Sequence, residues 1–156
     1  MEKEVGIYLD HSDAKMPTLA YEGDVGYDLY AIEDTIIPFG ALVEVNTGVH
    51  LQLPSDVFAQ INTRSSFGKK GLCLHHGVID SGFTGQLSIW IFNIGKTLSF
   101  NYDEDQSVYK GHDIYINKGD KIAQILFHKA ERPLLKQIKR LKKTERGDKG
   151  HGSSGK

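Results

Sequence analysis

Three short segments of this 156-residue chain carry side chains suited to phosphate chemistry. Arg64 stands beside two hydroxyls in Thr63-Arg64-Ser65-Ser66-Phe67-Gly68, and its planar guanidinium can hold two phosphate oxygens at once. Asp80 lies in Gly77-Val78-Ile79-Asp80-Ser81-Gly82-Phe83-Thr84-Gly85, where a carboxylate in a glycine-flanked hairpin could accept a proton from water. The third segment is the end of the chain, Arg146–Lys156.

This terminal segment has four glycines and two serines, and no aliphatic side chain that could pack into a core. It cannot offset the entropy of its own ordering by burying apolar surface. It can order around an anion, because glycine lets backbone N–H groups converge and Arg146 adds a fixed charge. The composition therefore predicts a lid over a polyphosphate, with an unstructured tail as the alternative.

Two further segments have related chemistry. Gly23–Ala31 places Asp24 and Asp28 in a glycine-relieved turn, and Gly119–Gln124 is a turn that leads into an apolar strand. Between the hairpin and this last turn, Lys96–His112 is polar and aromatic without periodicity, which indicates a long loop or a small inserted ribbon.

Net charge and hydropathy exclude several classes of partner. A formal charge of −1 gives no general attraction to nucleic acid or to anionic membranes, and Leu87–Ile94 is too short to span a bilayer. The single cysteine, Cys73, fits a reducing cytoplasm, and its position between two leucines predicts a small buried hydrophobe. His75 and His76 have no third ligand at metal-binding spacing, so we expect them to line the hairpin.

Seventeen glycines and short β-branched runs predict one all-β domain, of the sandwich, barrel or jelly-roll type. A helical period is present only over Leu134–Leu141. The expected strands, separated by polar turns, are Val5–Leu9, Leu42–Val45, Gly48–Leu53, Val57–Ile61, Leu87–Ile94, Ile114–Ile116 and Lys121–Phe127.

The five segments, in this order, resemble the five motifs of the homotrimeric dUTPases, with the terminal segment as the fifth. The resemblance runs from about Val5 to Gly155 and includes an insert at about 96–112, as in some phage-type members. It implies a distorted jelly roll (a β-clip fold) over residues 1–130, followed by a C-terminal arm and glycine-rich lid over 131–156. It also implies a cytoplasmic homotrimer, in a bacterium or a phage-infected host, whose sites combine residues of different subunits.

The reaction implied is hydrolysis of dUTP to dUMP and pyrophosphate, which limits uracil incorporation into DNA and supplies dUMP for dTMP synthesis. By resemblance, Asp80 is the general base for a water that attacks the α-phosphorus. Mg²⁺ is the implied cofactor, held mainly by substrate phosphates, with Asp28 orienting its water shell. Asp24 could assist Asp28, but a turn cap is the favoured interpretation of this residue.

The resemblance also assigns substrate contacts. Phe83 would pack below the deoxyribose, where many relatives have tyrosine; a place in the core is its alternative. His151 stands where many relatives have phenylalanine and would stack on uracil. Gln124 would contact phosphate or bond across subunits. The remaining expected substrate-binding residues are Arg64, Ser65, Ser66, Gly77, Val78, Ile79, Ser88, Arg146, Gly152, Ser153 and Ser154.

Two rival functions were weighed. The dCTP deaminases are similar in the Arg-Ser-Ser and Ile-Asp stretches but need a glutamate three residues before an Asn-x-Gly, where this chain has Trp90. No glutamate lies between Leu87 and Gly95, which argues against deamination. The other rival is a regulatory protein that contacts a protein partner through the 96–112 insert.

Overall fold

The computed structural model describes residues 4–75, 77–95 and 112–148. Nearly every regular element is a strand, which confirms the all-β prediction. The elements in chain order are β1 (Gly6–Leu9), β2 (Tyr27–Tyr30), β3 (Thr35–Ile37), β4 (Leu42–Gln52), β5 (Val57–Asn62), α1 (Ser65–Lys69), β6 (Leu72–Leu74), β7 (Val78–Ile79), β8 (Gln86–Asn93), β9 (Ile114–Ile116) and β10 (Lys121–Lys129).

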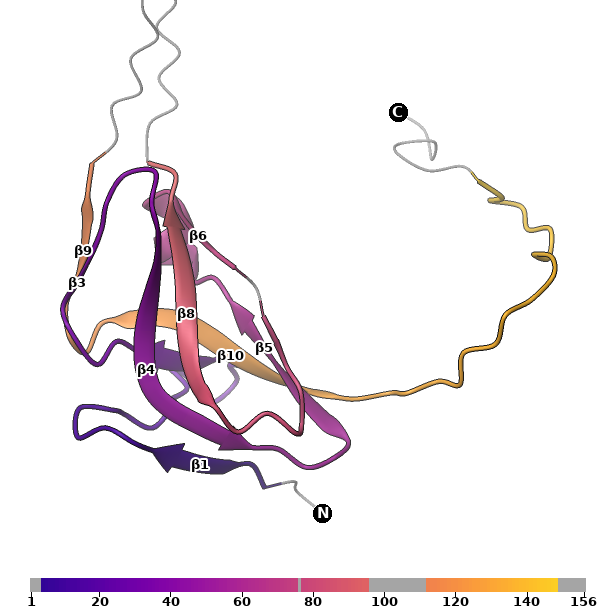
Figure 1. Cartoon of the computed structure of the whole chain (residues 1–156), viewed down its shortest axis with the longest axis horizontal. Helices are drawn as coiled ribbons and strands as arrows, with labels where there is room; N and C mark the ends of the chain where they lie inside the picture. The colour runs from indigo at the N-terminus through magenta and orange to yellow at the C-terminus, as the bar shows by residue number, and fades with distance from the viewer. Residues whose placement is uncertain (1–3, 76, 96–111, 149–156) are drawn as a thin grey trace, which may run out of the picture.

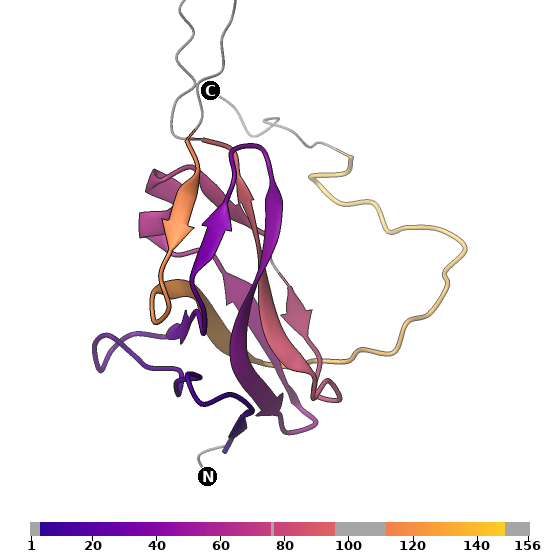
Figure 2. The same ribbon diagram turned by 60° about the vertical axis from the view of Figure 1, so that its left-hand side comes forward.

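Two four-stranded sheets face each other and enclose the core (Figures 1 and 2). One sheet has the strand order β1-β4-β8-β6 and the other β2-β10-β5-β7, while β3 and β9 form a small separate ribbon. Neighbouring strands in each sheet are far apart in sequence, as the crossovers of a jelly roll require. Many inward-facing aliphatic side chains of both sheets are at most 1% exposed, among them Val45, Ile89, Ile91, Leu29, Ile122 and Ile125.

The longer strands were predicted within one or two residues of their observed ends. Leu42–Val45 and Gly48–Leu53 were expected as two strands, but they form the single strand β4, whose register against β8 shifts between Asn46 and His50. Gly48 lies in this irregular part at a φ of +65°. A Cβ there would be 2.7 Å from the Cβ of Ala14, so close approach of the N-terminal loop requires glycine.

The helical period over Leu134–Leu141, which is too short to establish a helix by itself, forms no helix in the structure. After β10, residues 130–148 form an extended arm that leaves the sheets (Figures 1 and 2). Leu134, Leu135 and Leu141 are between 85% and 99% exposed. A helix of two turns needs a surface to pack on, and the arm has none in its own domain. The helix that does form, α1, was not predicted.

Cys73 is exposed, which corrects the expectation that it is buried. Leu72 and Leu74 point into the core from β6, so strand alternation places the cysteine between them on the outer face. There it pairs with Phe92 of β8, which pairs in turn with Leu42 of β4. Both Phe92 and Leu42 are more than one-third exposed, so this row forms an apolar outer face on the sheet.

The five residues of α1 are far fewer than a bilayer crossing needs, and no other helix occurs in the described ranges. Most of the insert predicted at 96–112 lies outside the described residues, as does His76. Nothing in the structure therefore tests the expectations placed on them.

Candidate active site

Asp28 is the centre of a charged cluster that joins three of the predicted motifs. Its side chain is 1% exposed in β2, and its two carboxylate oxygens are bonded to different cations. Oδ1 lies 3.0 Å from Nε of Arg64, and Oδ2 lies 2.8 Å from Nζ of Lys121. Gln124 of β10 donates a weaker bond of 3.4 Å to Oδ1. A buried carboxylate with this environment is compensated and rigid.

Arg64 is oriented by this cluster rather than freely exposed. Besides its ion pair with Asp28, it donates a hydrogen bond of 2.9 Å to the backbone carbonyl of Lys121. The Asp28 carboxylate also raises the pKa of the Lys121 ammonium above its ordinary value of 10.5. Both cations therefore keep their charge throughout the neutral range.

A cavity of about 300 Å³ opens beside these cations. Arg64, Lys70 and Lys121 contribute positive charge to its lining, Ser66 contributes a hydroxyl and Asp120 a carboxylate. Ser65 and Ser66 are exposed in the first turn of α1, directly after Arg64. Positive charge and hydroxyl donors around one cavity suit a phosphate group.

Asp80 lies in the loop that connects β7 to β8 and passes from one sheet to the other. These two strands do not pair, so the hairpin expected over Gly77–Gly85 is not formed, because β7 pairs with β5 instead. Its backbone carbonyl accepts a hydrogen bond of 3.0 Å from the N–H of Phe83, which closes the turn. The carboxylate side chain is exposed. Gly77, Val78 and Ile79 precede it at the sheet edge, where β7 pairs only with β5 in the described chain.

Phe83 is 44% exposed, so the alternative of a place in the core is excluded. Its ring covers Gly85, and the two define one side of the β7–β8 loop. Ser88 follows in β8, half-buried and paired with Asn46 of β4. Trp90 is on the same strand, 43% exposed on the outer face.

One chain does not bring Asp80 and the Arg64 cavity together. Ile79 pairs with Ala59, which places Asp80 beside the Phe58 end of β5, whereas Arg64 follows the other end at Asn62. Phe58 and Asn62 are four positions apart along the strand, or about 13 Å. The groups expected to act on one substrate therefore lie at opposite ends of the same strand.

The arm carries Arg146, which is exposed, at the end of the described residues. Gly147 follows with a φ of +55°, and its N–H bonds to Thr144 Oγ1 at 3.0 Å. The other expected lid residues, His151, Gly152, Ser153 and Ser154, lie outside the described residues. Asp24, expected as a turn cap, accepts a bond of 3.1 Å from the N–H of Tyr21, which confirms that role.

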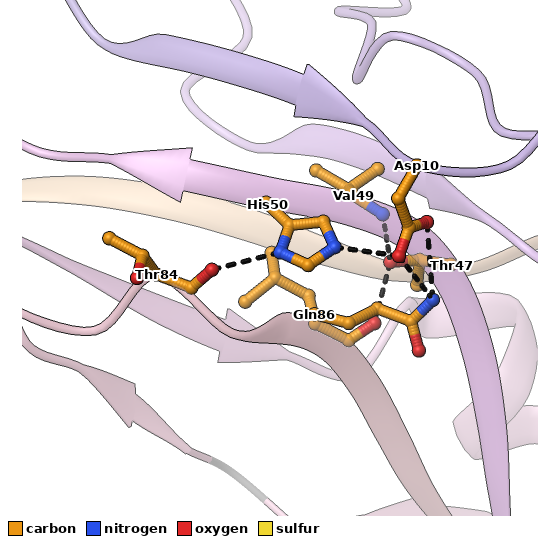
Figure 3. A network of polar contacts seen from close by, with 7 residues as sticks. Asp10, Thr47, Val49, His50, Thr84 and Gln86 are labelled. Carbon is orange, nitrogen blue, oxygen red and sulfur yellow. Dashed lines mark hydrogen bonds and ion pairs between the residues drawn. The ribbon is translucent and has the colours of Figure 1, made fainter.

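A second polar network was missed at the sequence level. His50 of β4 lies between the carboxylate of Asp10 and the backbone carbonyl of Thr84 (Figure 3). Its Nε2 is 2.7 Å from Asp10 Oδ2 and its Nδ1 is 2.8 Å from the carbonyl oxygen of Thr84. Residues 10, 50 and 84 have no common motif or spacing, so only the fold reveals the contact.

The carboxylates and imidazoles of the described residues form no cluster of three that could hold a metal ion. Both oxygens of Asp28 already bond to Arg64 and Lys121, so this carboxylate does not fit a protein-held inner-sphere Mg²⁺ site. The donor set fits only an ion whose ligands come chiefly from the substrate and water, with Asp28 outside the first shell.

Comparison with known proteins gives consistent matches. The family model described as dUTPase matches residues 12–108 and 105–155. The deoxyuridine 5'-triphosphate nucleotidohydrolase of monkeypox virus is 34% identical over 142 residues, which cover 91% of this chain and 84% of that protein.

Two solved phage structures are similar over most of their length. The dUTPase of Staphylococcus bacteriophage 80α was solved with dUpNHpp. It is described among phage dUTPases that control transfer of virulence genes by a G protein-like mechanism. It superposes with a TM-score of 0.85 at 27% identity and covers 99% of both chains. A mutant dUTPase from phage phi11 of S. aureus, described as coordinating a structural Mg(II) ion, has a TM-score of 0.75 at 26% identity, covering 88% of this chain and 98% of that one.

Proposed function

This chain belongs to the dUTPase family, and we propose that Asp80 is the general base of its reaction. The enzyme is a hydrolase that converts dUTP to dUMP and pyrophosphate. The observation that supports Asp80 is its place: an exposed carboxylate on a closed turn, three residues before an exposed ring. A proton acceptor must reach a solvent molecule, which a buried carboxylate such as Asp28 does not.

In the proposed mechanism, a water gives a proton to the Asp80 carboxylate while its oxygen forms a bond to the α-phosphorus. The bond from the α-phosphorus to the bridging oxygen breaks on the opposite side, and pyrophosphate leaves with that oxygen. The protein has no covalent intermediate to form, so its contribution is to position the water and to neutralise charge on the phosphate oxygens.

The cavity beside Arg64 is the proposed phosphate subsite. Arg64 is held by Asp28 and by the Lys121 carbonyl before any ligand arrives, so little ordering remains to be done on binding. Lys121 and Ser66 add a second cation and a hydroxyl, and Ser65 lies next to them on α1. Gln124 is proposed to act through Asp28, to which it bonds, rather than directly on phosphate.

The β7–β8 loop is the proposed uracil and deoxyribose subsite. Gly77, Val78 and Ile79 lie at a sheet edge, where backbone N–H and C=O groups are accessible to a base edge. Phe83 would pack against the deoxyribose and exclude a ribose 2′-hydroxyl. Ser88 lies further along β8 and remains a proposed contact. His151, Gly152, Ser153 and Ser154 would close over the nucleotide, together with Arg146.

Mg²⁺ is the proposed cofactor, coordinated by the triphosphate and water. When bound, such an ion neutralises oxygen charge on the substrate. Asp28 would act outside the first shell, through the cations that it orients.

A homotrimer with sites shared between subunits is the proposed assembly. Its support is the separation of Asp80 from the Arg64 cavity along β5, together with the apolar side chains displayed by the arm. Arg132 fixes the start of the arm by donating a bond of 2.7 Å to the carbonyl of Ser55, and beyond it Leu134 and Leu135 face solvent. These leucines would be buried by a neighbouring copy.

A protein partner at the 96–112 insert is proposed by analogy with the 80α enzyme, whose described role includes control of gene transfer. We also propose a cytoplasmic location in a bacterial or phage-infected cell.

A panel of dUTP, dTTP, UTP and dCTP with pyrophosphate release as the readout tests the function. We expect turnover of dUTP alone, and no ammonia from dCTP. Ammonia release would favour the deaminase instead. Native mass spectrometry tests the assembly, with an expected mass of three times 17.4 kDa.

A further inference from the structure

Asp10, His50 and Thr84 form a continuous chain of short contacts that ends in the β7–β8 loop (Figure 3). Asp10 directly follows β1, His50 lies in β4 and Thr84 lies in the loop before β8. Gln86 also approaches Asp10, with Nε2 3.4 Å from Oδ1. These contacts thus join three separate parts of the fold.

The two partners of the imidazole determine its protonation state. A backbone carbonyl and an ionised carboxylate can only accept hydrogen bonds. Nδ1 and Nε2 must both donate, and only the imidazolium form has a proton on each nitrogen. The pKa of Asp10 is lowered by its hydrogen bond to His50, so this carboxylate stays ionised and remains an acceptor.

Thr84 lies directly between Phe83 and Gly85, four residues after Asp80. The turn from Asp80 to Phe83 is closed by its own backbone hydrogen bond, so fixing the Thr84 carbonyl fixes the end of that turn. We propose that Asp10 and His50 are positioning residues that hold the Asp80–Gly85 loop in its nucleotide-binding conformation, through a chain that only the doubly protonated imidazole completes. This inference rests on the proposed role of the loop in binding dUTP.

The groups around His50 determine the pH at which this chain of hydrogen bonds is lost. Its hydrogen-bond partners are Asp10 and the Thr84 carbonyl. Its strand neighbours in the described structure are Gln86 of β8 and Tyr8 of β1, and the Tyr8 ring centroid lies 5.6 Å from that of His50. Asp10 alone among them is charged at neutral pH. Its hydrogen bond, followed by that of the Thr84 carbonyl, raises the pKa of His50 above the ordinary 6.5.

A group with a raised pKa stabilises the folded form fully below its ordinary pKa. That stabilisation is lost as the pH rises through the raised value. The loop should therefore loosen as the pH rises above 6.5 through the raised pKa of His50, which predicts a KM for dUTP that rises while kcat changes less.

The test measures kcat and KM for dUTP from about pH 6 to about pH 9 in the wild-type enzyme and three variants. We expect the wild-type KM to rise about five- to tenfold across this range, the net worth of one hydrogen bond. His50→Gln should have the high KM at every pH. Asp10→Asn should show the rise at lower pH, because the carboxylate no longer stabilises the imidazolium. His11→Gln is the matched control, since His11 lies near Asp13 but has no bond to the loop in the described structure, and it should follow the wild type.

An NMR titration separates this inference from the proposed function. The His50 ring should titrate above pH 6.5, the Gly85 amide should shift with the same midpoint, and Asp10→Asn should lower both midpoints. Coupled titration in a protein that does not hydrolyse dUTP would sustain the chain of contacts and remove the enzymatic role. A Gly85 amide that ignores the His50 titration, or a KM whose pH profile is the same in wild type and His50→Gln, would overturn the inference.

Discussion

The ring of Phe83 covers Gly85 so closely that no other residue fits beneath it. A Cβ at residue 85 would be 2.6 Å from Cζ of the ring and 2.9 Å from Cε2. Gly85 has no positive φ, so its role is to leave space and not to permit an unusual backbone. The glycine therefore leaves room for the ring that we propose packs against the deoxyribose.

Gly85→Ala should displace the Phe83 ring and weaken selection against the ribose 2′-hydroxyl. We expect the kcat/KM for dUTP to fall about tenfold while that for UTP falls less, since the lost group acts mainly on sugar selection. The ratio of the two kcat/KM values is the measurement.

Gly82→Ala is the matched control for this substitution. It adds the same methyl group to the same loop, but a Cβ at residue 82 meets no atom within 4 Å. Selection should remain as in the wild type. Equal effects of the two substitutions would show that the packing of Phe83 on Gly85 does not control the sugar.

Asp80→Asn should lower kcat by a factor of about 10² to 10⁴ and leave dUTP binding nearly unchanged, because the amide cannot accept the proton of the attacking water. Calorimetric titration with a non-hydrolysable analogue measures binding separately from turnover. Asp24→Asn, a change of an exposed carboxylate that caps a turn, is the control and should retain activity. A folded Asp80→Asn protein with normal turnover would refute the assignment.

Asp28→Asn should destabilise the fold and loosen Arg64. The substitution leaves two cations without their carboxylate; both side chains are partly exposed and can reach water, so the cost should be about 1–3 kcal/mol of unfolding free energy. Urea denaturation measures it. The KM for dUTP should rise as well, because Arg64 is no longer oriented. Unchanged stability would mean that the cluster contributes nothing to the fold.

Removal of Gly147–Lys156 should leave the melting temperature within a degree or two, since the described residues of this segment, Gly147 and Asp148, are exposed. Activity should fall sharply through loss of the lid. The comparison of thermal unfolding with steady-state kinetics on one preparation provides the test, and full activity of the shortened chain would remove the lid from the mechanism.

Much of the fold could be predicted because alternation in β5 and β8 is regular and turn residues bound the strands. Strand β2 was missed, because Tyr-Asp-Leu-Tyr places a carboxylate where an apolar side chain is expected. That carboxylate is tolerated only because Arg64 and Lys121 arrive from distant parts of the chain. The helical period at Leu134–Leu141 does not lead to a helix, because the arm has no surface in its own domain on which a helix could pack.

The candidate site likewise has one part that sequence motifs predict and another part that they do not. Asp80, Arg64 and Phe83 could be proposed from their motifs, since each lies in a segment with a recognisable composition. The bonds of His50 to Asp10 and Thr84 could not be predicted from the sequence, because none of the three residues lies in a motif with the other two. Contacts between residues that are distant in the sequence are visible only in the structure.

The distance between the Arg64 cavity and Asp80 along β5 has a genetic consequence. Two inactive alleles, one encoding Arg64→Ala and the other Asp80→Asn, should complement each other in a cell that expresses both. A mixed oligomer then contains a pocket that receives its arginine from one gene product and its aspartate from the other. Co-expression followed by an assay for dUTP turnover would reveal the rescue, whereas a polypeptide that completed its own pocket would give none.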